Sequence, residues 1–169
     1  MKLQGRAWKF GDNVDTDLII PARYLNSSDK DELVRNCFAD VRPGFVEMIS
    51  PGDIIVAGNN FGSGSSREHA PLVIKGAGIS VVIAQSFARI FYRNAFNIGL
   101  PIVESKEAPL SMREGNEVSV DLATGEIVIV DTGERFLAKP VPSFLREIVN
   151  AGGLVHYIKK KGLAERETE

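Results

Sequence analysis

Serine, arginine and histidine side chains gather in one glycine-rich segment, Gly58-Asn59-Asn60-Phe61-Gly62-Ser63-Gly64-Ser65-Ser66-Arg67-Glu68-His69-Ala70-Pro71. A serine that is flanked by loop N–H groups and an arginine can have its alkoxide stabilised, and it can then act as a base or a nucleophile. Arg67 is also suited to bind a substrate carboxylate through two parallel hydrogen bonds. The loop from Gly62 to His69 is therefore the first candidate for a functional site.

The same glycines could indicate a nucleotide-binding loop, but neither familiar pattern fits. A P-loop would need a lysine followed by serine or threonine after its last glycine, and here Ser65-Ser66-Arg67 follows Gly64. A dinucleotide-binding fingerprint would need a third glycine at Arg67. It would also need an acidic residue about twenty positions on, where Gln85-Ser86 stands. Nucleotide binding is therefore disfavoured.

A helix cap is the structural alternative for the two serines. Ser65-Ser66-Arg67-Glu68 matches a capping box, in which the first serine and the glutamate satisfy each other's free backbone donors. Pro71 weakens this interpretation, because it would then lie inside the helix and clash with a carbonyl of the preceding turn. We expect the helix to begin nearer His69 or Ala70, but the residues alone leave a cap and a functional loop equally open.

The histidines permit a serine hydrolase only in principle. His69 lies four residues from Ser65, and His156 is the other histidine of the chain. This spacing gives a Ser-His-Asp triad little support. We expect His69 to be a hydrogen-bonded structural residue.

The elements around this loop predict parallel strands with helices packed on them. Ile54 to Ala57 is an apolar run of strand length, as expected for a strand that is buried on both faces. The order strand, loop, helix, strand, helix, strand places the loop outside the carboxyl ends of the strands, where ligands bind in such sheets. After the loop we expect a helix at Ala70–Ala77, a strand at Ile79–Ala84, a helix at Phe87–Asn97 capped by Ser86 and ended by Gly99, and a strand at Leu100–Glu104.

The flanking segments complete a single domain that spans residues 1–169. A strand at Leu3–Phe10 and a helix that starts at Ser28 or Asp29 and runs to Cys37 precede the central unit. Short strands follow it, and two helices close the chain: Val118–Leu122, Ile127–Val130, Arg135–Ala138, Val141–Ala151 and Leu154–Lys161. We predict a mixed α/β fold that has a mostly parallel central sheet, flanking helices and a small C-terminal β meander.

Composition excludes several classes of partner. A net charge of −2, with no basic run longer than Lys159–Lys161, argues against nucleic acid and against an acidic membrane surface. Cys37 is the single cysteine, so this chain cannot form an internal disulfide, and it cannot hold an iron–sulfur cluster that needs about four thiolates. Without a signal peptide or an apolar run of membrane-spanning length, we expect a cytoplasmic protein.

Three motifs, taken together, resemble the small swivelling domain of the aconitase superfamily. They cover most of residues 5–105 in the order and spacing of that superfamily, and the whole chain is similar to the stand-alone small subunits of the 3-isopropylmalate dehydratase family. This resemblance implies a layered β/β/α swivelling fold. The motifs are Asp12-Asn13-Val14-Asp15-Thr16-Asp17-Leu18-Ile19-Ile20-Pro21, Gly62-Ser63-Gly64-Ser65-Ser66-Arg67-Glu68-His69-Ala70 and Ser86-Phe87-Ala88-Arg89-Ile90-Phe91-Tyr92-Arg93-Asn94-Ala95-Phe96-Asn97-Ile98-Gly99-Leu100-Pro101.

The resemblance implies half of a two-chain hydro-lyase that isomerises 2-isopropylmalate and 3-isopropylmalate in leucine biosynthesis. A large subunit would carry a [4Fe-4S] cluster, so this chain would bind no metal itself and would be inactive alone. In the family the first serine of the Ser-Ser-Arg-Glu segment moves the carbon-bound proton, which assigns that role to Ser65. Arg67 would bind the carboxylate of the malate-type substrate and support the alkoxide, and backbone groups around Ser66 would complete an anion-binding nest.

Two further sets of residues have open interpretations. Asp15, Thr16 and Asp17 are either an Asx-rich turn that satisfies its own backbone or a loop that faces the site and orients Arg67. Arg89 and Arg93 lie one helical turn apart, so they could contact the partner subunit, although a solvated face explains them more simply.

Substrate choice in the family is attributed to the loop after Tyr24, here Leu25, Asn26 and Ser27. Homoaconitase relatives place an arginine after Tyr-Leu to pair with a third carboxylate, and this chain has Asn26 there. An unpaired carboxylate in a closed site would cost about 1–3 kcal/mol or more, whereas Leu25 suits a branched alkyl group. Isopropylmalate is thus favoured over homoaconitate, 2,3-dimethylmalate or citraconate stays open, and a free-standing anion-binding module is the non-enzymatic alternative.

Overall fold

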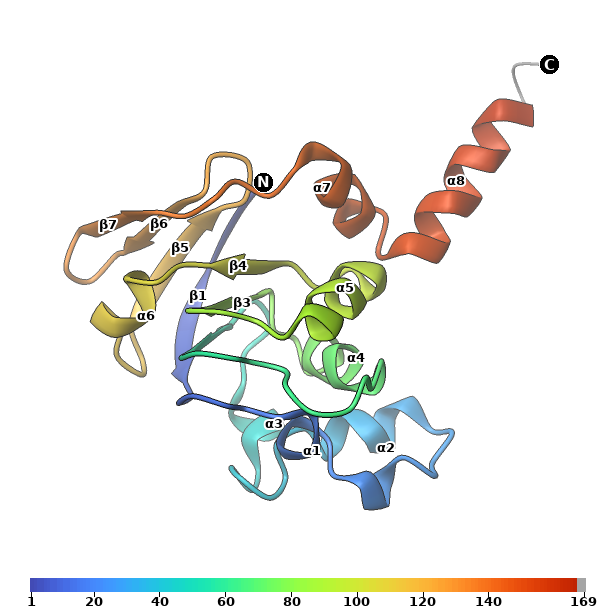
Figure 1. Ribbon diagram of the computed structural model, residues 1–169, viewed down its shortest axis with the longest axis horizontal. Coiled ribbons are helices and arrows are strands. Elements are labelled where there is room, and N and C mark those ends of the chain that lie inside the picture. Colours follow the sequence, from blue (N-terminus) through green and yellow to red (C-terminus); the bar gives the residue numbers. More distant parts are fainter. Residues whose placement is uncertain (167–169) are drawn as a thin grey trace.

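The computed structural model describes the backbone of residues 1–166 and the side chains of residues 1–162, and it is built on a mixed seven-stranded sheet (Figure 1). The strand order is β4-β3-β2-β1-β5-β6-β7. The pairs among β1 to β4 are parallel, and β5, β6 and β7 continue the sheet from β1 as an antiparallel meander. The strands are β1 (Lys2–Lys9), β2 (Ile54–Ala57), β3 (Val81–Ala84), β4 (Ile102–Glu104), β5 (Glu117–Asp121), β6 (Glu126–Ile129) and β7 (Glu134–Leu137).

This architecture confirms the predicted α/β fold, with one addition. The C-terminal meander is not a separate layer, because β5 pairs with β1 and joins the parallel half of the sheet. The helices are α1 (Thr16–Ile19), the 3-10 helix η1 (Ala22–Tyr24), α2 (Lys30–Arg35), α3 (Phe45–Met48), α4 (His69–Gly76), α5 (Arg89–Ile98), α6 (Ala108–Ser111), α7 (Ser143–Asn150) and α8 (Leu154–Arg166). None of the helices in the described part of the chain is long and apolar enough to cross a membrane.

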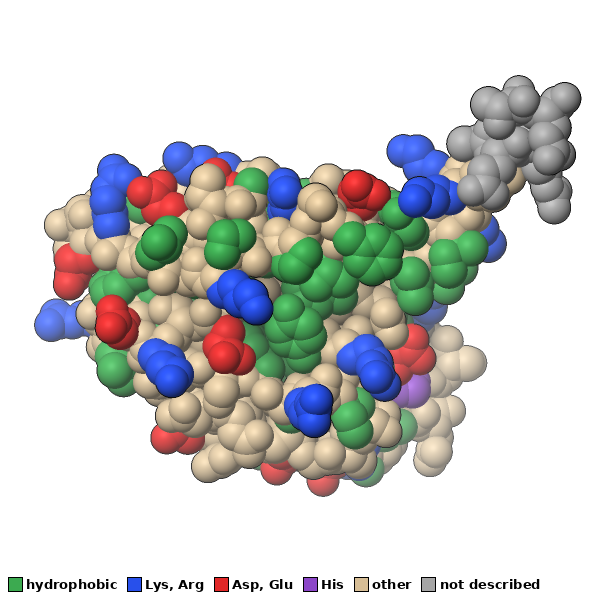
Figure 2. Space-filling model, turned by 45° about the horizontal axis from the view of Figure 1, so that its top comes forward, with side chains coloured by type: hydrophobic (Ala, Val, Ile, Leu, Met, Phe, Trp, Pro, Cys, Tyr) green, Lys and Arg blue, Asp and Glu red, His purple; other side chains and the backbone are tan. Residues whose placement is uncertain are grey.

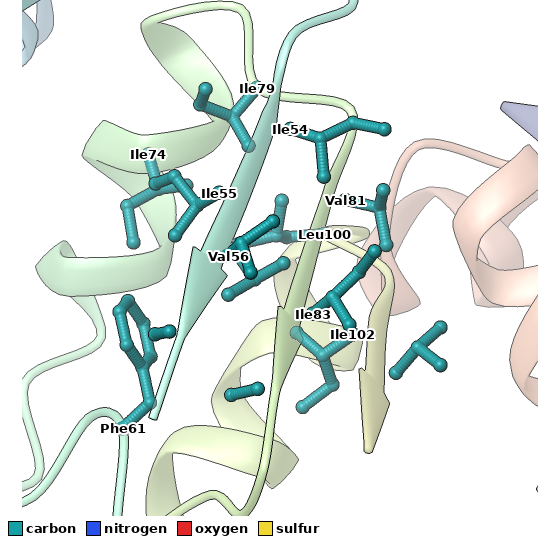
Figure 3. Close-up of a cluster of buried hydrophobic side chains, with 14 of the residues drawn as sticks. Ile54, Ile55, Val56, Phe61, Ile74, Ile79, Val81, Ile83, Leu100 and Ile102 are labelled. Carbon is teal, nitrogen blue, oxygen red and sulfur yellow. The ribbon is translucent and has the colours of Figure 1, made fainter. Parts of the chain in front are cut away.

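The buried core explains why β2 and β3 form where the sequence predicts them. All four residues of each strand are buried, and Ile54 pairs with Val81 in register. In Figure 3, Ile55 lies beside Ile74 of α4, while Ile54 and Val56 lie on the other side of β2. Each fully buried side chain of this kind contributes about 1.5–3 kcal/mol. The strands therefore give the loop that follows β2 a rigid base.

A second cluster of aromatic rings holds the N-terminal region against the sheet. Phe10 at the end of β1 lies 4.4 Å from Phe38, and Phe38 meets Phe45 of α3 edge-on at 5.3 Å between ring centroids. Aromatic pairs in such edge-on arrangements add about 0.5–1.5 kcal/mol beyond the area they bury. The cluster fixes the segment between β1 and β2, which includes the Asp12–Pro21 motif.

The two helices next to the candidate loop begin differently from one another. α4 begins at His69, as the position of Pro71 predicts, and no side chain caps it, so the capping box of Ser65 and Glu68 is not formed. The prediction that Ser86 caps α5 is wrong: the helix begins at Arg89, and the Ser86 hydroxyl accepts a hydrogen bond from Asn60 N at 2.8 Å. Residues 86–88 are extended because Phe87 pairs with Phe61, and the helix therefore begins later in the chain than predicted.

Candidate active site

Two segments that are far apart in the sequence form the base of the candidate site. The loop after β2 receives backbone hydrogen bonds from the N-terminal motif, Asn13 N to Asn59 O at 2.8 Å and Thr16 N to Ser63 O at 2.8 Å. A third bond runs the other way, from Gly62 N to Val14 O at 2.7 Å. The Asp12–Pro21 motif and the glycine-rich loop are therefore one structural unit at the carboxyl edge of the parallel strands.

Close packing explains two glycines of the loop. Gly62 has φ +79°, and a Cβ added there would lie 2.1 Å from Cγ of Phe91 on α5. Gly64 has φ +90°, with the Thr16 hydroxyl 3.4 Å from the position of its Cβ. Side chains rarely adopt this left-handed conformation, and at Gly62 none would fit. At Gly62 both the conformation and the packing require glycine, and at Gly64 the positive φ favours it.

Ser65 is fixed through its backbone while its hydroxyl is left available. Its carbonyl accepts hydrogen bonds from the Thr16 hydroxyl at 3.0 Å and from Arg67 N at 2.8 Å. Both Ser65 and Ser66 are exposed. Neither their hydroxyls nor their backbone N–H groups make a hydrogen bond with any other described residue. These groups can therefore bind an anion that approaches the loop.

Arg67 is partly buried and held from one side. Its Nη1 donates to Oδ1 of Asp17 at 2.6 Å and to the carbonyl of Ile20 at 3.3 Å. The hydrogen bond and the charge of Arg67 lower the pKa of the Asp17 carboxyl, so the pair is ionised at neutral pH. Nε and Nη2 of Arg67 have no partner within the described residues. These two nitrogens form the edge that a substrate carboxylate could take.

The N-terminal acidic residues divide between the two interpretations that the sequence left open. Oδ1 of Asp15 accepts from Leu18 N at 2.9 Å and caps α1, as expected for a turn that satisfies its own backbone. Thr16 and Asp17 instead contact Ser65 and Arg67. Of these residues, Asp17 makes the contact that can orient Arg67.

His69 does not have the hydrogen bond that we expected. It is the first residue of α4 and half-buried, yet its imidazole makes no hydrogen bond with any residue that the structure describes, Ser65 included. His156 lies on α8, where it lines a groove with residues of α2 and α4. The geometry therefore gives no support to a serine hydrolase.

The predicted specificity loop, residues 25–27, follows η1. Leu25 is half-buried against the core, and Asn26 is exposed without a hydrogen bond to another described residue. The Ser27 hydroxyl is engaged, since it bonds to Glu32 and accepts from Asp29 N at 3.1 Å. Within the described chain no hydrogen bond joins residues 25–27 to the glycine-rich loop, so Leu25 and Asn26 are freer than Ser27 to meet a ligand.

Cys37, the single cysteine of the chain, is poorly placed to bind a metal. Cys37 is 1% exposed, and burial raises the pKa of its thiol, which disfavours the thiolate that metals bind. Among the described residues, no three His, Cys, Asp or Glu side chains are grouped so that they could hold a metal ion.

Two asparagines of the site escaped the sequence analysis. Asn13 and Asn60 both have positive φ, 53° and 59°, and Nδ2 of Asn60 donates to Oδ1 of Asn13 at 3.1 Å. Asparagine tolerates this left-handed conformation better than most residues. The Asp12-Asn13 and Asn59-Asn60 pairs beside turn residues were the available signal, but their mutual contact depends on a pairing that sequence spacing does not reveal.

Comparison with known proteins agrees with this geometry. Residues 46–107, which include the loop and α5, match the family model of the aconitase C-terminal domain. A curated relative from Halothermothrix orenii, a 3-isopropylmalate dehydratase small subunit, is 60% identical over 94% of this chain and 96% of its own length. This chain belongs to the 3-isopropylmalate dehydratase small subunit family. The resemblance seen in the three motifs is thereby confirmed.

Members of the family differ in the substrates that their names carry. A small subunit of isopropylmalate/citramalate isomerase from Methanocaldococcus jannaschii is 56% identical over 94% of this chain and 95% of its own length. The crystal structure of a 3-isopropylmalate dehydratase from the same organism is 47% identical and has a TM-score of 0.90, with all of both chains covered. The family fold thus extends along the whole chain.

Proposed function

We propose that this chain is the small subunit of a two-chain hydro-lyase that interconverts 2-isopropylmalate and 3-isopropylmalate by dehydration and rehydration. One arrangement carries the proposal: the Ser65 hydroxyl is exposed and unpaired among the described residues, beside an arginine that Asp17 holds with two nitrogens free. A base and a carboxylate clamp are thereby displayed together at the carboxyl edge of the sheet, where ligands bind in parallel α/β folds.

Ser65 is the proposed base. As an alkoxide, Oγ would take the proton from the substrate carbon next to the one that carries the hydroxyl, and the hydroxyl would leave from that neighbouring carbon. Rehydration in the opposite sense completes the isomerisation. The hydroxyl is added to the carbon that lost its proton, and Oγ returns the proton to the carbon that lost its hydroxyl. The positive charge of Arg67 and the free N–H groups of Ser65 and Ser66 favour the anionic form of the serine.

Arg67 is the proposed carboxylate clamp. With Nη1 committed to Asp17 and Ile20, the remaining Nε and Nη2 match the two oxygens of a carboxylate. Asp17 and Thr16 are positioning residues in this scheme, because they act through Arg67 and Ser65. His69, the first residue of α4, has no proposed chemical step.

The group that assists departure of the hydroxyl is assigned to a partner. The names of the relatives describe small subunits, which implies a large one. We place the [4Fe-4S] cluster on that large subunit, because Cys37 is buried and unsuited to hold it. The cytoplasmic location stays a prediction of the sequence.

Isopropylmalate is the first choice of substrate, and citramalate is the second. Leu25 offers apolar contact for a branched alkyl group, and Asn26 has no charge to receive a third carboxylate. The name of the Methanocaldococcus jannaschii relative includes citramalate, which favours a smaller malate-type substrate as the alternative. Homoaconitate is disfavoured by the absence of a cation at position 26.

The proposal is tested by reconstitution. The chain is mixed with the cluster-loaded large subunit of its own organism, and formation of the unsaturated intermediate from 3-isopropylmalate is followed by ultraviolet absorbance. We expect no turnover with the chain alone, turnover with both, and a loss of about 10²–10⁴-fold in kcat for Ser65→Ala. Ser111→Ala, at an exposed serine of α6, serves as the matched control.

Other outcomes would point elsewhere. Full turnover by the Ser65→Ala complex would eliminate Ser65 as the base. A chain that binds malonate or phosphate by calorimetry, yet gives no turnover with the loaded large subunit, would favour the free-standing anion-binding module.

A further inference from the structure

A groove of about 580 Å³ lies at the same edge of the sheet as the candidate loop. We call it the α5 groove; its lining residues are Phe87, Arg89, Ile90, Tyr92, Arg93 and Glu104. Five of these belong to the segment that follows β3, and Glu104 ends β4. Because β2, β3 and β4 are parallel, the residues after their carboxyl ends meet at one edge.

The groove is joined directly to the catalytic loop. Phe61, one residue before Gly62, donates its N–H to Ser86 O at 3.0 Å and accepts from Ala88 N at 2.9 Å. The Phe61 ring also meets the Phe87 ring at 6.0 Å between centroids. A protein that reaches Ser65 would therefore approach the edge of the sheet at which the α5 groove lies.

The exposed surface of the groove is apolar and basic. Ile90 is 50% exposed and Tyr92 is 39% exposed. The side chains of Arg89 and Arg93, one turn apart on α5, form no ion pair or hydrogen bond with any other described residue, in a chain whose net charge is −2. Arginine and aromatic side chains are enriched at protein interfaces, and here both lie beside an exposed isoleucine.

The apolar surface continues beyond the groove. Figure 2 shows hydrophobic side chains gathered on the face over α5 and α7, with lysine and arginine side chains around them. Phe144 of α7 is 55% exposed and Val155 at the start of α8 is 62% exposed. Exposed apolar side chains are therefore present on α7 and α8 as well as on α5.

We propose that the α5 groove docks the large subunit, with Arg89 and Arg93 paired to acidic side chains of that subunit and with Ile90 and Tyr92 covered by its apolar side chains. This inference rests on the proposed function, since the large subunit is the partner that must reach Ser65. A second copy of this chain fits less well, because a symmetric contact would bring the same arginines toward each other and would leave the site incomplete.

A charge-reversal pair tests the proposal. The double variant Arg89→Glu, Arg93→Glu is compared with Arg35→Glu, Arg113→Glu, which reverses two exposed arginines outside the groove. Both are titrated with the cluster-loaded large subunit, and affinity and turnover are measured. For the groove variant we expect at least a tenfold weaker complex and recovery of kcat at saturating large subunit; for the control variant we expect the affinity of the natural chain.

Each remaining outcome is decisive. Natural affinity in the groove variant would overturn the docking proposal and leave the proposed function intact, since natural subunits would still turn over. If natural subunits formed no active complex, the proposed function itself would fail. If sedimentation showed that the natural chain self-associates and the groove variant does not, the groove would be an interface between copies.

Discussion

Asp17 and Arg67 lie fifty positions apart and form an ion pair, with Oδ1 2.6 Å from Nη1. Asp17 follows the cap of α1, and Arg67 precedes the first turn of α4. The pair therefore connects the Asp12–Pro21 motif to the glycine-rich loop. The Asp17 side chain is 62% exposed, so solvent screens the ion pair. We therefore expect the pair to orient the Arg67 side chain and to contribute little to the stability of the fold.

Removal of Asp17 should damage turnover without damaging the fold. Asp17→Ala leaves Nη1 with the Ile20 carbonyl alone, so the free edge of Arg67 can rotate away from the substrate. We expect kcat/KM to fall by about 10–100-fold, because misplacement of a binding group by about 1 Å has effects of that size. Asp17→Asn, which keeps an oxygen acceptor, should lose less. Equal denaturation midpoints for all three chains are the control, and unaltered kcat/KM in Asp17→Ala would contradict the positioning role.

The pH dependence of this ion pair follows from the lowered pKa of Asp17. Arg67 lowers the pKa of Asp17 below its ordinary value, so the interaction is complete above about pH 4 and is lost only as pH falls through the lowered pKa. The ratio of kcat/KM between the natural complex and the Asp17→Asn complex should therefore be constant from about pH 6 to 9. A ratio that changes within that range would show that Asp17 titrates there.

Gly62 should tolerate no side chain. Gly62→Ala combines a left-handed backbone with a Cβ 2.1 Å from Cγ of Phe91, and we expect a loss of about 2–4 kcal/mol in the free energy of unfolding. Gly115→Ala is the matched control, because its φ is +89° but nothing lies within 4 Å of the added Cβ. It should lose about 1 kcal/mol. Urea denaturation measures both, and equal losses would mean that packing against Phe91 is unimportant.

The Thr16 hydroxyl should fix the backbone of the proposed base. Thr16→Val removes the donor to the Ser65 carbonyl at a residue that is 3% exposed, and Thr16→Ser keeps it. We expect Thr16→Val to lose about 1 kcal/mol of stability and to lower kcat more than it raises KM, with recovery in Thr16→Ser. If Thr16→Ser lost kcat and Thr16→Val, which keeps the methyl, did not, the methyl packing and not the hydroxyl would be responsible.

Local patterns predicted the elements, while contacts between segments decided the site. The apolar runs at β2 and β3 and the position of Pro71 determine the strands and the start of α4 from nearby residues alone. Serine often caps a helix, and we therefore predicted that Ser86 caps α5. Its hydroxyl instead accepts a hydrogen bond from Asn60, which is 26 positions away. For the same reason the sequence left open whether Asp17 contacts Arg67 or only its own turn. Tertiary packing decides which distant loops come together.

Asn26 should act as the determinant of the number of substrate carboxylates. It is exposed and has no hydrogen bond with other described residues, so an arginine fits there without displacing a structural contact. In the Asn26→Arg complex we expect kcat/KM for 3-isopropylmalate to fall at least tenfold and turnover of homoaconitate to rise. The new guanidinium would pair with the third carboxylate of homoaconitate and would contact an alkyl group poorly. Ser28→Arg, two positions along the same exposed loop, adds the same charge and should leave the preference between the two substrates unchanged. If Ser28→Arg shifted the preference equally, the general charge of the loop, and not a contact at position 26, would set specificity.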